Sequence, residues 1–163
     1  MTDSSALVQI PQRLDFDAVV PIFSRAVSSL DDAATTELDR VGIDAQLREI
    51  IRLRASQMNG CAYCVDMHSK AAAKTGATQQ KLHAVAIWHD SGLFTARERA
   101  ALELTEAVTR LSETHVPESV FAGALQEFSE DEVGALVALI VTINVWNAIG
   151  VSTRCWNPPR DST

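Results

Sequence analysis

The sequence has 163 residues, of which 47% are hydrophobic and 6% aromatic, and its formal net charge at pH 7 is -7. A chain of this length can bury one substantial core, and its composition, rich in Ala, Leu and Val with only 7 glycines, favours helices over sheet. The acidic balance excludes nucleic acid as an expected partner, because a phosphate-binding protein needs a cationic face. We therefore expect an all-α protein with an N-terminal arm, residues 1–14, and one compact helical domain, residues 15–163.

The first residues, Met1 to Ser5, are polar and acidic and lack the basic and apolar regions of a signal peptide. Three cysteines in a chain without such a signal fit a reducing cytosol, so we expect a cytoplasmic location. The whole N-terminal arm, residues 1–14, is a candidate strap onto a neighbouring subunit.

Helical spacing of apolar residues begins at Phe16, and Pro21 is expected in the first turn of that helix, where its missing N–H costs nothing. The acidic, mixed segment 31–41 is interpreted as a frayed helix end and a loop. Asp44 is the expected N-cap of a second helix. A third helix follows and ends at Gly76, a suitable C-terminal cap.

Further start signals divide the second half of the chain. Thr78 is expected to open a short helix, and the segment 88–94 is predicted to be a loop. Thr95 and Ser129 are each followed three residues later by Glu, which predicts capping boxes at the starts of two helices. Another helix is expected between them, after Pro117.

The last predicted helix has no charged residue from Val133 to Thr153. It reaches the roughly 20 residues that a membrane span requires. However, Asn144 and Asn147 would be costly in lipid, and the preceding flank is strongly acidic. We therefore expect a buried core helix or a subunit interface rather than contact with a membrane.

Redox chemistry is concentrated around two of the cysteines. Cys61, Cys64 and His68 are spaced i, i+3 and i+7, which places them on one face of the third helix. Cys61 lies near the start of that helix, where free backbone N–H groups favour a thiolate. Such a pair can form a disulfide across one turn, and one sulfur can resolve a sulfenic acid formed on the other.

Glu49 lies twelve residues before Cys61. In one straight helix the two residues would be about 18 Å apart along the axis. The chain is expected to turn at Asn59–Gly60, since both residues tolerate a left-handed backbone. Packing of the helices on either side of this turn can then bring Glu49 back beside the thiols.

The pattern formed by Glu49, Cys61, Cys64 and His68 resembles the core of the AhpD-like alkyl hydroperoxidases, within the carboxymuconolactone decarboxylase superfamily. The resemblance covers roughly residues 21–156. It extends to several shorter matches: Leu53-Arg54-Ala55-Ser56-Gln57, Trp88, Leu93-Phe94-Thr95, Arg97-Glu98-Arg99 and Asn144-Val145-Trp146-Asn147.

The resemblance implies a thiol-dependent peroxidase that reduces organic hydroperoxides. Cys64 would attack the peroxide, Cys61 would resolve the sulfenic acid to a disulfide, and Glu49 and His68 would form a proton relay. No bound cofactor is implied, but an external dithiol or lipoyl-type reductant protein is required. The resemblance also implies a homo-oligomer, a trimer or a hexamer, which the apolar last helix suits.

One position departs from the best-studied relatives, which carry a second histidine just before the second cysteine. This chain has Tyr63 there, and a tyrosine hydroxyl is a poor base near neutral pH. Tyr63 and Trp88 are candidates for the wall of a substrate pocket.

Several alternatives stay open at this stage. The cysteine pair with His68 and Glu49 offers four possible zinc ligands, although structural zinc sites usually draw ligand pairs from separate loops. The same cysteines would also serve a disulfide reductase or redox adaptor acting on protein or lipoyl partners, or a helical oligomer that senses oxidant or metal. The lactone decarboxylase branch fits least, because the resemblance implies that those enzymes lack the cysteine pair. Cys155 is interpreted as a packed or idle thiol.

Overall fold

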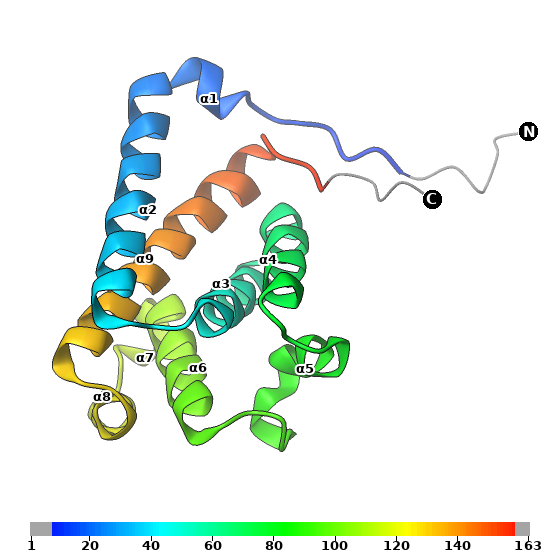
Figure 1. The fold of residues 1–163 in the computed structure, drawn as a ribbon. Coiled ribbons are helices and arrows are strands. Elements are labelled where there is room, and N and C mark those ends of the chain that lie inside the picture. The colour runs from blue at the N-terminus through cyan, green and yellow to red at the C-terminus, as the bar shows by residue number, and fades with distance from the viewer. Residues whose placement is uncertain (1–7, 159–163) are drawn as a thin grey trace, which may run out of the picture.

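A computed structural model describes residues 8–158, and within this range the chain forms helices and no strand, as expected for an all-α protein (Figure 1). Nine α-helices and one 3-10 helix lie in this part of the chain. Their bounds are α1 Phe16–Val19, α2 Pro21–Val41, α3 Ala45–Asn59, α4 Ala62–Lys74, α5 Gln79–Ala84, η1 Val85–Asp90, α6 Ala96–Thr109, α7 Leu111–Thr114, α8 Glu118–Glu127 and α9 Glu130–Thr153.

Helix α2 continues to Val41, so the interpretation of residues 31–41 as a frayed end and loop is wrong. The helix persists because Ala34 and Leu38 extend its buried face into the core. It ends at Gly42, whose left-handed backbone, with φ of 74°, lets its N–H bond back to carbonyls of the last turn. Pro21 occupies the start of α2, after a separate single turn, α1.

The turn between α3 and α4 reverses the chain as predicted. The Asp44 side chain accepts a hydrogen bond from Leu47 N–H at 2.9 Å and caps α3. Gly60, with φ of 71°, ends α3 in the left-handed conformation that glycine adopts at no steric cost. Helix α4 therefore packs back along α3.

The short elements of the second half follow most of the predicted start signals. Thr78 caps α5, and both capping boxes, at Thr95 and Ser129, are present. Two boundaries differ from the predictions. Helix α4 ends at Lys74, two residues before Gly76, and η1 replaces the first part of the predicted loop 88–94.

Helix α9 runs through the middle of the fold and packs against α2, α3 and α6 (Figure 1). Eleven of its 24 residues are buried, including Asn147 with no exposed surface. By length and composition α9 could also cross a membrane. Its burial among other helices is that of a central core helix, as predicted.

The two described ends of the chain meet at the C-terminal end of α9. The backbone N–H groups of Arg13 and Leu14 both donate to the carbonyl oxygen of Thr153, at 2.9 and 3.1 Å. Figure 1 shows the blue and red segments running beside each other there. Residues 1–7 of the predicted arm lie outside the described range, and its role as an intersubunit strap stays a prediction.

Candidate active site

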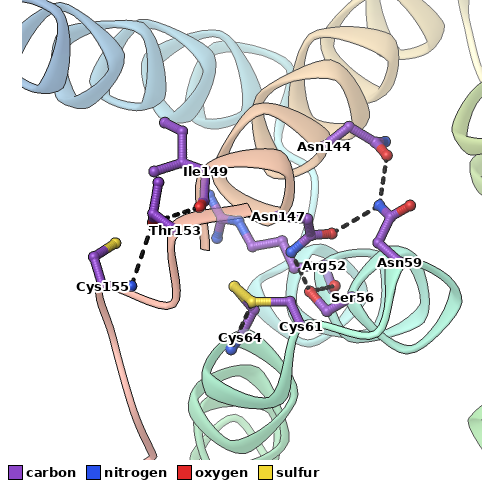
Figure 2. The surroundings of a disulfide bond; sticks show 10 residues. All are labelled: Arg52, Ser56, Asn59, Cys61, Cys64, Asn144, Asn147, Ile149, Thr153 and Cys155. Carbon is purple, nitrogen blue, oxygen red and sulfur yellow. Dashed lines mark hydrogen bonds between the residues drawn. A yellow bond between two sulfur atoms is a disulfide. The ribbon is translucent and has the colours of Figure 1, made fainter. Parts of the chain in front are cut away.

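The two cysteines form the first turn of α4. Cys61 is the N-cap residue, and its Sγ accepts a hydrogen bond from Cys64 N–H at 3.4 Å. The two Sγ atoms are joined in a disulfide, and the Cα atoms lie 5.3 Å apart (Figure 2). Both residues are buried, with 3% and 2% of their surface exposed. The structure therefore shows the oxidised form of the predicted pair.

Buried polar side chains of α9 and α3 fix this turn in place (Figure 2). Cys61 N–H donates to the Ser56 carbonyl at 3.0 Å. Asn147 donates to the Ser56 hydroxyl at 3.1 Å and accepts from Asn59 at 3.0 Å. These bonds connect α9 to the residues just before Cys61, so Asn147 positions the turn that carries the disulfide.

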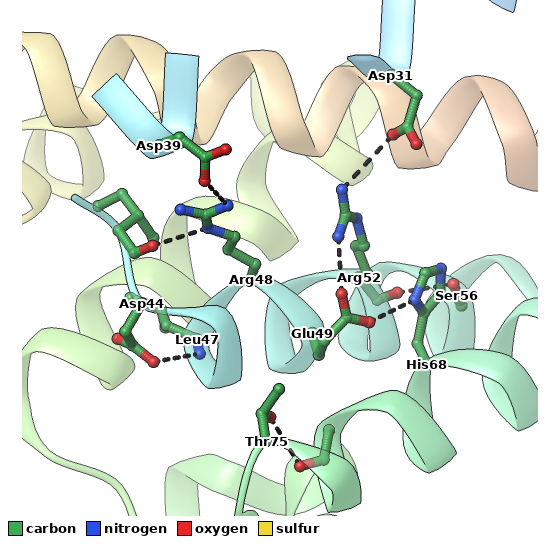
Figure 3. Close-up of polar contacts among 12 residues, drawn as sticks. Asp31, Asp39, Asp44, Leu47, Arg48, Glu49, Arg52, Ser56, His68 and Thr75 are labelled. Carbon is green, nitrogen blue, oxygen red and sulfur yellow. Dashed lines mark hydrogen bonds and ion pairs between the residues drawn. The ribbon is translucent and has the colours of Figure 1, made fainter. Parts of the chain in front are cut away.

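Glu49 and His68 meet across the α3–α4 hairpin. His68 Nδ1 lies 2.8 Å from Glu49 Oε2, and Arg52 donates to Glu49 Oε1 at 2.7 Å (Figure 3). Arg52 also pairs with Asp31 of α2 at 3.6 Å. Three helices thus contribute to one chain of charged contacts that ends at the imidazole.

The charges of Glu49 and Arg52 determine which nitrogen of His68 carries the proton. Burial opposes ionisation of the Glu49 carboxyl, but the hydrogen bond from His68 and the charge of Arg52 outweigh it and lower the pKa of Glu49. The resulting carboxylate can only accept, so Nδ1 of His68 donates, and Nε2 of the neutral ring is an acceptor. Nε2 is buried and has no hydrogen-bond partner among the described residues.

A cavity of about 540 Å³ adjoins Cys64 and His68. Its polar wall comes from α1 and α2, and its aromatic wall comes from α4, α9 and the segment that follows α9. Arg52, Met67 and Ile143 complete the lining. The polar wall consists of Asp17, Ser24, Ser28, Asp31 and Thr35, and the aromatic wall of Tyr63, Trp146 and Trp156.

The four residues predicted to carry the chemistry are brought together by the α3–α4 hairpin, and Tyr63 lines the cavity as expected. Trp88 does not meet the expectation for a pocket wall. It lies in a separate core cluster with 2% of its surface exposed, and its Nε1 donates to Glu106 at 2.7 Å. A buried indole N–H needs a hydrogen-bond acceptor, and Glu106 provides one at this position.

Two further observations bear on the open alternatives. Cys155 is a free, partly exposed thiol whose backbone N–H bonds to the Thr153 hydroxyl. Within residues 8–158, no group of three or more His, Cys, Asp or Glu side chains is arranged to hold a metal ion.

The helical fold, the buried cysteine pair at a helix start and the Glu–His pair beside it define an AhpD-like protein. The family model for the carboxymuconolactone decarboxylase family matches residues 21–107, and the chain belongs to this family. The uncharacterized Bacillus subtilis protein YdfG is 37% identical over 110 residues, which cover 68% of this chain and 75% of YdfG.

Solved structures share the fold. A protein of unknown function from Agrobacterium tumefaciens, assigned provisionally to antioxidant defence as an AhpD protein, is 33% identical with a TM-score of 0.86, covering 92% of this chain and all of that chain. The AhpD core of a peroxidase-related protein from Ralstonia eutropha is 23% identical with a TM-score of 0.75, covering 89% of this chain and 74% of that one. The debrominase Bmp8 is 24% identical with a TM-score of 0.66, covering 81% and 69%. The fold is therefore shared by a debrominase and by proteins related to peroxidases, so the function of this chain has to be argued from its site.

Proposed function

We propose that this protein is a thiol-dependent peroxidase that reduces organic hydroperoxides. The observation that carries the proposal is that Cys64 and His68 line the same cavity, while Nε2 of His68 is buried and has no hydrogen-bond partner within residues 8–158. A reactive sulfur and a proton acceptor thus face a space large enough for an organic molecule.

The surroundings of the two sulfurs support different roles for them. Cys64 is part of the cavity lining. The Sγ of Cys61 instead packs against Gly150 of α9, where it lies 3.2 Å from the position that a Cβ would occupy. Cys64 is therefore the attacking cysteine of the proposal, and Cys61 is the resolving one.

The reaction begins with the reduced pair. The Cys64 thiolate attacks one oxygen of the hydroperoxide, the O–O bond breaks, and the leaving alkoxide takes a proton to become an alcohol. Cys64 is now a sulfenic acid. The Cys61 sulfur attacks the Cys64 sulfur, water leaves, and the disulfide closes.

His68 and Glu49 move the proton in this scheme. Nε2 of His68 accepts the proton of the Cys64 thiol and then donates it to the leaving alkoxide. Glu49 holds the ring through Nδ1 at 2.8 Å and stabilises the imidazolium that forms in between. Arg52 keeps Glu49 ionised.

Two electrons and two protons from an external dithiol then restore the thiols, so the scheme needs no bound cofactor. Because both cysteines are at most 3% exposed, a slender dithiol such as a lipoyl group suits the site better than a folded protein surface. Assembly as a trimer or hexamer and a cytoplasmic location remain predictions.

The test uses the Cys155→Ser protein, so that only the cysteine pair titrates. The protein is reduced, freed of reductant and metals, and mixed with a small excess of an organic hydroperoxide. Intact mass should fall by two hydrogens, and two thiols should disappear, within minutes. Thiols that persist, in a protein that still exchanges disulfides with lipoyl dithiols, would overturn the peroxidase and leave a disulfide reductase.

A further inference from the structure

The lining of the cavity beside Cys64 carries information about the molecule that enters it. The volume, about 540 Å³, lies in the range of sites that enclose small organic ligands and exceeds the needs of hydrogen peroxide. The distribution of rings and charges around this volume therefore indicates which kind of organic group the hydroperoxide carries.

The aromatic wall is built from three rings, of which Trp156 contacts the other two. The Trp156 ring lies 5.5 Å from that of Trp146 and 5.9 Å from that of Tyr63, measured between centroids. The Trp156 indole N–H donates to Asp17 at 3.2 Å, which ties the C-terminal segment to the polar wall. Ring faces held in this way favour a flat, unsaturated body, because offset and edge-to-face aromatic contacts add to the burial of apolar area.

The polar wall carries negative charge. Asp17 and Asp31 line the cavity, and Glu49 lies directly behind His68. The only cation among the described lining residues is Arg52, which already pairs with Glu49 at 2.7 Å and with Asp31 at 3.6 Å. The cavity thus has three carboxylates in or directly behind its lining and one guanidinium, which already pairs with two of them, so a substrate carboxylate would find no free cation among the described lining residues.

We propose that this cavity selects an organic hydroperoxide with a flat aromatic body and no negative charge, and that Trp156 and Asp17 set this preference. The inference rests on the proposed peroxidase function. It excludes hydroperoxides that bear a carboxylate, such as those of free fatty acids, from the preferred substrates.

The size of the charge effect follows from Coulomb's law. A substrate carboxylate about 7 Å from a wall carboxylate, in a dielectric close to that of water, loses a factor of about three in occupancy. Two such carboxylates, partly offset by Arg52, give a loss of about fivefold.

The first experiment compares cumene hydroperoxide with its para-carboxylate and para-(trimethylammonio)methyl derivatives at fixed ionic strength. The second-order rate constant of Cys64 oxidation is measured for each and divided by the rate of the same compound with free cysteine. The carboxylate should react about fivefold more slowly than the neutral compound, and the cation at least as fast as the neutral one. Asp17→Asn, which keeps an acceptor oxygen for Trp156, should restore about half of this loss on a logarithmic scale. Glu103→Gln removes an equal charge from the exposed face of α6 and should leave the ratio unchanged.

The second experiment tests the aromatic wall. Wild type should oxidise severalfold faster with cumene hydroperoxide than with its saturated-ring counterpart, and Trp156→Leu should bring this ratio close to one. Asp17→Asn should leave it unchanged, and thermal unfolding confirms that each variant is folded.

Equal normalised rates for the neutral, anionic and cationic compounds, or a charge ratio that Asp17→Asn does not move, would overturn the charge selection while the peroxidase function stands. A ring preference that survives Trp156→Leu would overturn the role of Trp156. If no hydroperoxide oxidises Cys64 in wild type, the proposed function fails and this inference fails with it.

Discussion

Replacement of Glu49 by Gln tests the relay and the packing of the hairpin together. The substitution keeps the shape of the side chain but removes the negative charge of the carboxylate. The two oxygens of this carboxylate lie 2.8 Å from Nδ1 of His68 and 2.7 Å from Nη1 of Arg52. Gln can present either its oxygen or its amide to His68, so Nδ1 is no longer held as the donor.

The structure sets the size of the stability loss. The Glu49 and Arg52 side chains are only 14% and 13% exposed, and breaking a fully buried pair costs roughly 3–5 kcal/mol. Arg52 keeps its contact with Asp31 at 3.6 Å, so we expect a loss of about 2 kcal/mol. The neighbouring pair of Arg48 and Asp39 provides the control (Figure 3). Asp39 is 66% exposed, so Asp39→Asn should cost less than about 1 kcal/mol.

Denaturant unfolding of the oxidised proteins measures these losses, and rapid-mixing oxidation of the reduced proteins measures the relay. Positioned acid–base groups contribute about 10²–10⁴ in rate, so Glu49→Gln should slow Cys64 oxidation by about 100-fold, while Asp39→Asn leaves it unchanged. A Glu49→Gln protein that oxidises at the wild-type rate would refute the relay, even if its stability falls as expected.

Four further outcomes follow from the site. Asn147→Ala should lower the free energy of unfolding by about 2–3 kcal/mol, because it leaves buried polar partners unsatisfied. Gly150→Ala places a methyl 3.2 Å from a disulfide sulfur and should destabilise the oxidised protein by about 1 kcal/mol. Gly134→Ala adds a methyl with no described atom within 4 Å and should stabilise the protein by about as much. Thermal unfolding of the two variants measures both effects. Trp156→Ala should speed reduction of the disulfide by dithiothreitol severalfold, because this ring covers the same part of α9 that the sulfur contacts. The difference in unfolding free energy between wild type and Glu49→Gln should hold at neutral pH and close as pH falls below 4.5. The reason is that the folded protein lowers the pKa of Glu49, so it gains this stability only while the carboxyl is ionised.

Each of these outcomes can fail separately. An Asn147→Ala protein of wild-type stability would show that the hydrogen bonds of Asn147 with Ser56 and Asn59 do not stabilise the turn before Cys61. Equal effects of the two glycine substitutions would contradict the close contact at Gly150, and an unchanged reduction rate would contradict shielding by Trp156. A stability gap that does not narrow as pH falls below 4.5 would show that the Glu49 charge is not its source.

The sequence predicted the α3–α4 hairpin and the arrangement of Cys61, Cys64 and His68 within it, because local signals determine both. The Asn59–Gly60 turn follows from backbone preference, and Cys61, Cys64 and His68 follow from the period of one helix. Three arginines, Arg48, Arg52 and Arg54, lie within five residues of Glu49 on the same helix, and their spacing alone does not choose the partner of Glu49. In the structure, Arg52 pairs with Glu49, while Arg48 pairs with Asp39 and Arg54 with Glu106.

The cavity walls were less predictable because they combine distant segments. Asp17 and Trp156 lie 139 residues apart, and no spacing rule joins them. Trp88 was misplaced because composition cannot tell a pocket ring from a core ring. The continuation of α2 was available in principle, since Val27, Ala34 and Leu38 keep the helical period, but the acidic residues between them obscured it.

In the proposed reaction Cys64, rather than Cys61, attacks the hydroperoxide. This assignment is tested by mixing reduced Cys61→Ser and Cys64→Ser proteins, each also carrying Cys155→Ser, with one equivalent of an organic hydroperoxide and following intact mass over time. The Cys61→Ser protein should gain one oxygen, localised to Cys64, while the Cys64→Ser protein should stay unchanged over the same period. Oxygen gained at Cys61 in the Cys64→Ser protein at an equal or higher rate would contradict this assignment.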